Sequence, residues 1–179
     1  MTVSSKLRKG LSSGGGDAGP NVADVFSTYL YDGNGGTQTI TNGIDLAGEG
    51  GLVWMKVRNN AWSRHELVNT ERGSGKSLET SDAAAERGFS GLSSFNSDGF
   101  TLNNASGQVN SSGDNRYVSW TFKKAPRFFD IQEFTTTYNA SPNIIPTDLE
   151  CTIGMAIFKQ LDSTGQGENW IVYHRGLGL

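Results

Sequence analysis

The chain of 179 residues is poor in the side chains that build disulfide frameworks, metal cages and catalytic triads. Cys151 is its one cysteine, which excludes an intrachain disulfide and a metal site built from several cysteines. The two histidines, His65 and His174, do not share a motif, so a catalytic triad or a zinc site has no support. The sequence therefore predicts no catalytic residue, no metal ligand and no cofactor.

Charge and long apolar runs are also scarce. Charged residues make up 18% of the chain and the net charge is −3, which gives little electrostatic support for a nucleic-acid partner. No apolar run approaches the roughly 18 residues of a membrane span. The N-terminus places basic residues (Lys6, Arg8 and Lys9) ahead of glycine instead of an apolar segment. We therefore expect neither a membrane span nor a signal peptide.

Glycine and alternating apolar residues are abundant instead. With 24 glycines and 10% aromatic residues, the composition is typical of a turn-rich β protein. Short segments with period-two alternation, separated by turns such as Asn96-Ser-Asp-Gly99, predict many short strands and hence an all-β sandwich or jelly roll. The expected strands are residues 25–31, 37–41, 51–57, 65–70, 99–103, 116–123, 128–134, 154–160 and 169–174.

Residues 116–123 give the clearest strand pattern, because Val118, Trp120 and Phe122 alternate with Tyr117 and smaller polar residues. We expect the set around Trp120 to face the core together with Trp54. Slipping the register by one residue would bury the opposite set.

The segment from Phe26 to Gly75 recurs without a gap from Phe129 to Gly178. Apolar runs, turns and an Arg-Gly pair coincide at one offset of 103 positions, with residue 154 over 51 and 175 over 72. The chain thus contains one module and half of a second. The half module must pack on the first one, continue into further residues, or find its missing strands in another chain.

These features divide the chain into an N-terminal arm (residues 1–24), a first β module (25–127) and half of a repeated module (128–179). The arm is rich in glycine and has few large apolar groups, so it is either a disordered tail or a segment that orders against a partner. In the second case we expect docking through its basic and apolar residues, which are Lys6, Leu7, Arg8, Lys9 and Leu11.

Two segments partly match motifs of nucleotide binding or catalysis, but neither match is complete. Gly73-Ser-Gly-Lys-Ser77 ends like a phosphate-binding loop, but Thr70 stands where the first glycine is needed. Asp148 and Glu150 have the spacing of a strand-borne acid pair, but no third acid or aromatic platform is near in sequence. A helical turn is expected at 82–87.

Trp62 differs from the other tryptophans because it lies in a polar loop, Arg58-Asn-Asn-Ala-Trp-Ser-Arg64. An exposed indole beside amides and arginines can stack on the apolar face of a sugar. The candidate glycan-binding residues are Trp62, Arg64, Asn59 and Asn60. The alternative is that Trp62 anchors the loop by folding back on the sheet.

Several strings together resemble a family of tailed-phage virion proteins that is frequent in marine and cyanobacterial phages. They are Val25-Phe-Ser-Thr-Tyr-Leu-Tyr-Asp-Gly-Asn-Gly35, the run from Thr37 to Trp54, Thr70-Glu-Arg-Gly73, Ser94-Phe-Asn-Ser-Asp-Gly-Phe100 and Val118-Ser-Trp-Thr-Phe-Lys-Lys-Ala-Pro126. The resemblance implies a tail-fibre-like structural protein with concanavalin A-like jelly-roll modules of the lectin or LamG kind. It also implies a chain that extends past Leu179.

The expected function is therefore that of a non-enzymatic virion component, a tail fibre or tail-associated appendage held by its N-terminus. The expected partners are other virion proteins, either a tail adaptor or nozzle or the capsid, within a homotrimer and with a role in attachment to the host. A host-surface glycan is a further expected partner. The alternatives are a lectin-like carbohydrate-binding module and a decoration protein on the capsid surface.

Overall fold

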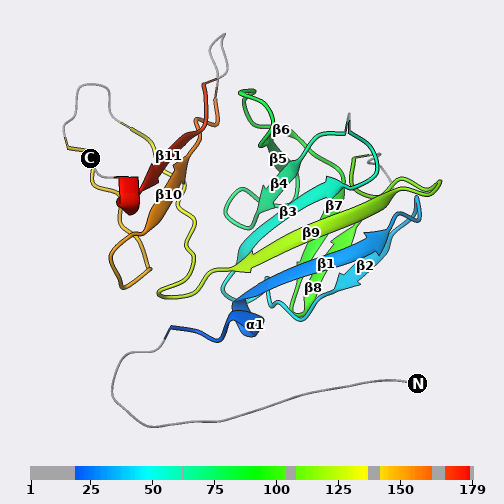
Figure 1. The fold of residues 1–179 in the computed structure, drawn as a ribbon, viewed down its shortest axis with the longest axis horizontal. Helices are drawn as coiled ribbons and strands as arrows, with labels where there is room; N and C mark the ends of the chain where they lie inside the picture. The colour runs from blue at the N-terminus through cyan, green and yellow to red at the C-terminus, as the bar shows by residue number, and fades with distance from the viewer. Residues whose placement is uncertain (1–18, 62, 104–107, 137–141, 163–167, 178–179) are drawn as a thin grey trace.

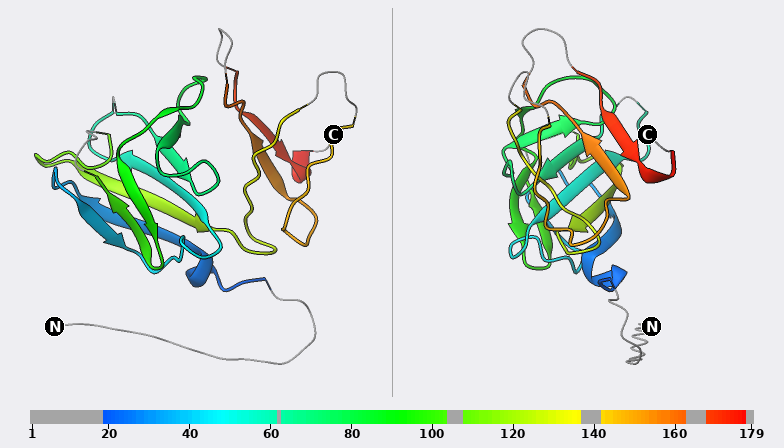
Figure 2. Two further views of the ribbon diagram at one scale, coloured as in Figure 1. Left: turned by 180° about the vertical axis from the view of Figure 1, so that it is seen from behind. Right: turned by 90° about the vertical axis from the view of Figure 1, so that its left-hand side faces the viewer.

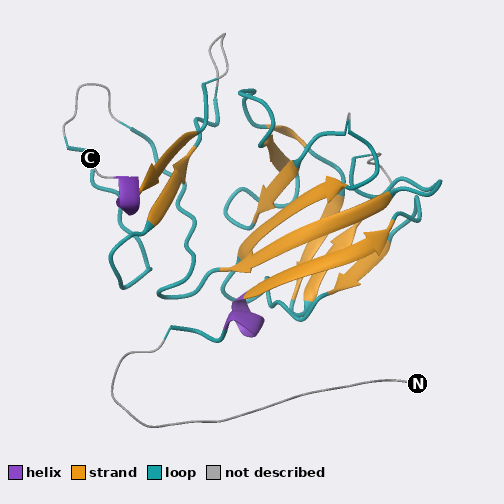
Figure 3. Ribbon diagram, in the orientation of Figure 1, coloured by secondary structure: helices purple, strands orange, loops and turns teal. Residues whose placement is uncertain are grey.

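The computed structural model describes residues 19–61, 63–103, 108–136, 142–162 and 168–177. Two antiparallel sheets pack face to face, and a separate pair of strands lies beside them (Figures 1 and 3). The all-β sandwich expected from the sequence is confirmed, and strands account for nearly all of the regular structure.

The long sheet has the strand order β1-β9-β3-β4-β5-β6. Its strands are β1 (Phe26–Asp32), β9 (Arg116–Lys123), β3 (Gly51–Val57), β4 (Glu66–Asn69), β5 (Lys76–Glu79) and β6 (Arg87–Gly88). The short sheet has the order β2-β8-β7, from β2 (Gln38–Thr41), β8 (Gly99–Leu102) and β7 (Leu92–Asn96). The separate pair is β10 (Met155–Phe158) and β11 (Ile171–His174), followed by the 3₁₀ turn η1 (Arg175–Leu177).

The core lies between the two sheets. Val53, Met55 and Val57 of β3 point inward and are at most 2% exposed, and Ile40 and Phe100 face them from the short sheet. The left view of Figure 2 shows the molecule from behind, with the short sheet in front. The short sheet covers the part of the long sheet formed by β1, β9 and β3. Val68 of β4 still belongs to this core, and beyond it the same face of the sheet carries the charged residues Glu66, Glu79 and Arg87.

The face of β9 that meets the core differs from the prediction. Tyr117, Ser119 and Thr121 are buried on the inner face, whereas Trp120 is only half-buried on the outer one. Tyr117 stacks on Tyr31 with ring centroids 5.2 Å apart. The prediction was wrong because alternation separates the two faces of a strand without saying which face meets the other sheet, and the core was assigned to the set with more large apolar side chains. Packing of the two sheets buries the set in which Tyr117 is followed by the small residues Ser119 and Thr121.

The outer face of the long sheet holds the aromatic side chains that were expected in the core. Trp54 and Trp120 meet edge to face with centroids 5.6 Å apart, and the Trp54 indole N–H donates to His65 Nδ1 at 3.0 Å. Phe26 and Phe122 lie further along the same face at 4.9 Å. These rings form a second, more exposed apolar layer.

The strand pair β10–β11 is an antiparallel hairpin like β3–β4, but its two strands do not share the single offset of 103 that the sequence comparison predicted. Leu52 is opposite Asn69 in the first module, and Met155 is opposite His174 in the second. In both, the residue after the second strand donates to the glycine before Leu52 or Met155: Thr70 N to Gly51 O and Arg175 N to Gly154 O, each at 3.0 Å. The offset is thus 103 positions for β10 and 105 for β11, so the second connection is two residues longer and Arg175 takes the place of Thr70, not that of Arg72 as predicted.

Two expected elements are absent from the described residues. The strand predicted at 128–134 is reduced to one bridge between Ala125 and Phe129, so Phe129 does not take the place of Phe26 in a sheet. The helical turn predicted at 82–87 is a loop ending in β6. Two carbonyl groups of this loop accept hydrogen bonds from the β10–β11 region. Lys159 Nζ donates to Ala83 O, and Trp170 Nε1 donates to Asp82 O. A single helical turn is too short to compete with such contacts.

The junction between the modules is closely packed. Phe129 lies 5.3 Å from Phe122, ring to ring, and exchanges two backbone hydrogen bonds with Ala125. Lys124 Nζ lies 3.5 Å from Asp130 Oδ1. At the same end of the sandwich, where Phe26 pairs with Phe122, the chain enters β1 through the short helix α1 (Val22–Val25), which the Asn21 side chain caps. The two ends of the first module are therefore tied to the sheet.

We expect Met55→Ala to lower the free energy of unfolding by about 2–5 kcal/mol, because the side chain is fully buried and its removal leaves a cavity. Leu30→Ala is the matched control; Leu30 is 57% exposed on the edge strand β1, and its removal should change stability by no more than about 0.5 kcal/mol. Urea unfolding of both variants measures the difference. Equal losses would contradict the assignment of the inner face.

Candidate functional site

The loop that carries the predicted glycan-binding residues is held by internal hydrogen bonds. Asn59 Nδ2 donates to Asp114 O at 2.7 Å, and its Oδ1 accepts from Arg116 N at 3.0 Å. Lys56 Nζ donates to the carbonyl oxygens of Asn60 and Ser63 at 3.1 and 2.6 Å. These bonds fix the shape of the loop and occupy the Asn59 amide.

Arg64 turns away from Asn59, toward β5. Its Nη1 donates to both carboxylate oxygens of Glu79, at 2.7 and 2.6 Å. The structure thus directs Asn59 toward the start of β9 and Arg64 toward the charged end of the long sheet. Trp62 lies outside the described residues, as do the predicted docking residues of the arm, Lys6, Leu7, Arg8, Lys9 and Leu11.

A buried cluster of charges covers the inner face of β4, β5 and β6. Glu66 and Glu79 are direct neighbours across β4 and β5, and they are 0% and 2% exposed. Arg87 bridges them, with Nη2 on Glu66 Oε1 and Nε on Glu79 Oε1. Ser77 Oγ donates to Glu66 Oε2 at 2.9 Å. Both carboxylates are therefore fully engaged within the protein.

Sequence reasoning did not find this acid pair, because β5 and β6 were not predicted and the pairing of Glu66 with Glu79 joins residues 13 positions apart. Neighbouring carboxylates on adjacent strands have the spacing that some glycoside hydrolases use. A substrate would have to displace Arg87 and Arg64 to reach them. We assign the cluster a structural role at the end of the sandwich that the short sheet leaves uncovered.

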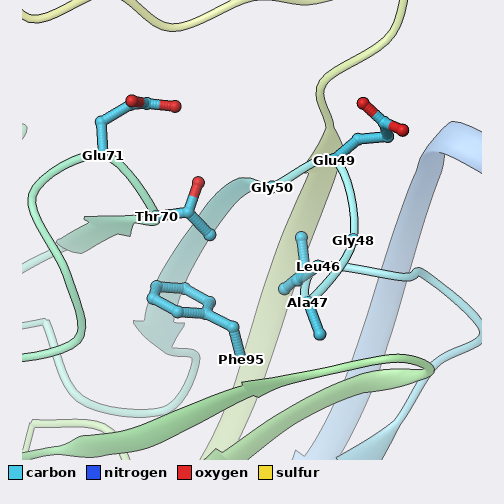
Figure 4. A pocket seen from close by; sticks show the side chains of 8 residues that line it. All are labelled: Leu46, Ala47, Gly48, Glu49, Gly50, Thr70, Glu71 and Phe95. Atoms are coloured by element: carbon cyan, nitrogen blue, oxygen red, sulfur yellow. The ribbon is translucent and has the colours of Figure 1, made fainter.

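An open depression lies beside the start of β3 (Figure 4). It measures about 430 Å³ and is lined by Leu46, Ala47, Gly48, Glu49, Gly50, Thr70, Glu71 and Phe95. In Figure 4 the Phe95 ring lies below Thr70, and the loop that carries Glu49 lies on the other side of the depression. Most of its polar groups are already bonded, since Thr70 Oγ1 accepts from Gly51 N at 2.9 Å and Glu71 accepts from Lys124 at 3.0 Å. Few groups remain to orient a ligand.

The strand pair β10–β11 exposes apolar side chains on both of its faces. Ile157 and Val172 are opposite each other and are 52% and 54% exposed, and Met155 and Ile171 are 53% and 65% exposed. In the first module the strand equivalent to β10 lies between two neighbours, β9 and β4. Within the described residues, β10 pairs with β11 alone, so its other edge is open. A two-stranded ribbon with this composition is marginally stable without a cover.

Other kinds of site find no support in the part of the chain that the structure describes. No cluster of three or more His, Cys, Asp or Glu side chains there could hold a metal ion. No described helix is long and apolar enough to cross a membrane. The phosphate-loop-like segment ends in strand β5, which begins at Lys76, where a nucleotide-binding loop would need a helix.

Comparison with known proteins gives one match. The profile of a family described as "Domain of unknown function (DUF7483)" matches residues 21–179. The matched range includes both the sandwich and the β10–β11 pair, and it begins where the arm meets α1. No curated protein and no solved structure matches the chain.

The charge cluster predicts a pH dependence of stability. Burial raises the pKa of Glu66 above its ordinary value of 4.5, and the Ser77 hydrogen bond and the Arg87 charge oppose this shift. The folded protein then holds the proton more tightly than the unfolded chain, so the free energy of unfolding falls as pH rises from 4.5 toward the raised pKa.

We expect Glu66→Gln to lose this fall, because the amide cannot ionise. Urea unfolding across the same pH window measures the slope. Glu133→Gln is the control, since Glu133 is exposed and distant from the cluster in the chain, and it should keep the slope of the unaltered protein. A slope that does not change in Glu66→Gln would refute the burial argument.

Proposed function

We propose that this chain, which belongs to the DUF7483 family, is a non-enzymatic structural component of a phage virion, a tail fibre or tail-associated appendage. The single observation that carries the proposal is the apolar β10–β11 ribbon. A protein that acts alone in solution seldom leaves four large apolar side chains more than half exposed on one ribbon. A subunit of an assembly buries them against its neighbours.

The first module indicates which kind of neighbour would cover the open edge of β10. In the first module, β9 pairs along β3 from Gly51 to Val57. An antiparallel strand with apolar residues, placed along the open edge of β10, would complete the equivalent sheet of the second module. Copies of the same chain arranged around a threefold axis are the arrangement that we propose, in keeping with the resemblance to fibre proteins.

The resemblance to tailed-phage virion proteins supports the location, and the engaged carboxylates support a role without catalysis. In this proposal the arm docks on a tail adaptor, nozzle or capsid protein through Lys6, Leu7, Arg8, Lys9 and Leu11. The sandwich then projects outward, where it can contribute to attachment to the host. Decoration of the capsid surface is the alternative location.

Self-association should depend on the ribbon. We expect the double substitution Ile157→Ser and Val172→Ser to convert an oligomer into monomers, because it removes the paired apolar side chains that a neighbour would bury. Sedimentation of the purified chain measures the mass. Leu30→Ser is the control; it is equally exposed, at 57%, but lies on β1. An oligomer that survives the double substitution, or an unaltered chain that is monomeric at all concentrations, would contradict the role of the ribbon.

Incorporation into particles should depend on the arm. We expect deletion of residues 2–20 to leave the sandwich folded, because α1 and β1 begin beyond the deletion, while the protein disappears from purified virions. Circular dichroism checks the fold, and antibody detection on phage particles checks incorporation. The substitution Glu133→Gln in the intact chain serves as the control for normal incorporation. Full incorporation of the deleted chain would disprove the docking role.

A further inference from the structure

A second open depression, called the Trp170 cavity below, lies where the β10–β11 pair meets the loop after β5. Its volume is about 400 Å³, within the range of small-molecule sites. It is lined by Thr80, Ser81, Asp82, Ala83, Asn169 and Trp170. One wall thus comes from the first module and the other from the half module, some 90 positions later in the chain.

Both walls are fixed to one another. The Trp170 indole N–H donates to Asp82 O at 3.0 Å and to Glu79 O at 3.3 Å. Lys159 Nζ donates to Ala83 O at 3.1 Å, and Glu86 N donates to Leu161 O at 2.9 Å. These bonds hold the indole by its nitrogen edge, so the ring keeps one orientation along the cavity. Such a wall is organised before any ligand arrives.

The polar groups of this cavity are available, unlike those of the depression beside Phe95. Asp82 Oδ1 accepts from Ala84 N at 3.2 Å, which leaves Oδ2 without a partner in the described part of the chain. The side chains of Thr80, Ser81 and Asn169 make no hydrogen bond to other described residues, and Ser81 and Asn169 are exposed. A carboxylate oxygen, an amide and two hydroxyls therefore border one partly exposed indole.

We propose that this cavity binds an uncharged pyranose sugar. The apolar C–H face of a pyranose stacks on an indole, and its hydroxyl groups both donate and accept hydrogen bonds. Asp82 Oδ2 accepts from ring hydroxyls, and the Asn169 amide can both donate and accept. The inference goes beyond the virion role and does not depend on it.

The charges around the cavity select against acidic sugars. Asp82 places a negative charge in the cavity wall. The nearby cation, Lys159, already donates to the carbonyl oxygens of Ala83, Gln160 and Glu168, at 3.1, 3.0 and 2.9 Å. An ammonium group has three donors, so none remains to bind a carboxylate or sulfate on the ligand. A uronic acid would therefore meet the charge of Asp82, and Arg64, the cation that interacts with Asp82, is already bound to Glu79.

The test uses the full chain labelled with ¹⁵N, in which the indole N–H signal of Trp170 is assigned by its loss in Trp170→Phe. The chain is titrated separately with the methyl glycosides of glucose, galactose, mannose and N-acetylglucosamine, and with glucuronic acid as the charged counterpart. We expect at least one neutral glycoside to shift the Trp170 signal with saturation, and glucuronic acid to leave it in place.

Substitutions then locate the binding. Asp82→Asn keeps the oxygen that caps Ala84 but replaces the free carboxylate oxygen, and it should weaken binding by roughly tenfold, the loss of one charge-assisted hydrogen bond. Asn169→Ala should weaken it several-fold, and Asp98→Asn, in the turn between β7 and β8, should not change it. The indole signals of Trp54 and Trp120 report that each variant is folded.

The proposal is overturned if no neutral glycoside shifts the Trp170 signal, or if Asp82→Asn and Asn169→Ala bind as tightly as the unaltered chain. It is also overturned if glucuronic acid binds as well as the neutral sugars. Because all of these measurements use the isolated protein, they are independent of whether the chain is found in virions.

Discussion

The whole sandwich depends on one strand that pairs on both sides. β9 follows the first eight strands in the chain and lies between β1 and β3. Its Tyr117 pairs with Tyr31 of β1 and with Val57 of β3. Its Trp120 pairs with Thr28 and Trp54 in the same way. Without it, β1 has no neighbour and the core loses the wall formed by Tyr117. Because these partners lie more than 55 positions away in the chain, the sheet closes only after a costly long-range encounter. The buried stack of Tyr31 on Tyr117 contributes part of the stabilisation that offsets this entropic cost.

The sequence was sufficient for the class of fold and for most strands of the first module, since alternation and turn residues are local signals. It was insufficient where the signal is not local. The more apolar face of β9, with Trp120, is the outer one, so the choice of Tyr117, Ser119 and Thr121 for the core depends on the sheet that packs against them. The strand β5 has the polar sequence Lys-Ser-Leu-Glu, and it is held by ion pairs that no periodicity reveals.

The same limit applies to the candidate sites. The sequence of the loop around Asn59 and Arg64 predicted a binding surface. In the structure, the side chains of Asn59 and Arg64 instead hold the loop against β9 and β5. The cavity beside Trp170 could not be predicted, because Asp82 and Trp170 are brought together only by the packing of the half module on the first. The buried pair of Glu66 and Glu79 adds little net stability for its desolvation cost, and its geometry instead favours one register of β4 on β5.

The junction at Phe122, Ala125 and Phe129 also has a mechanical meaning. Three aromatic rings, a two-bond bridge and the ion pair of Lys124 with Asp130 leave few backbone torsions free to change between one module and the next. A connection of this kind behaves as a stiff coupling and not as a hinge. We expect a torque applied to the sandwich to reach the residues after Phe129 through these contacts instead of being lost in the linker.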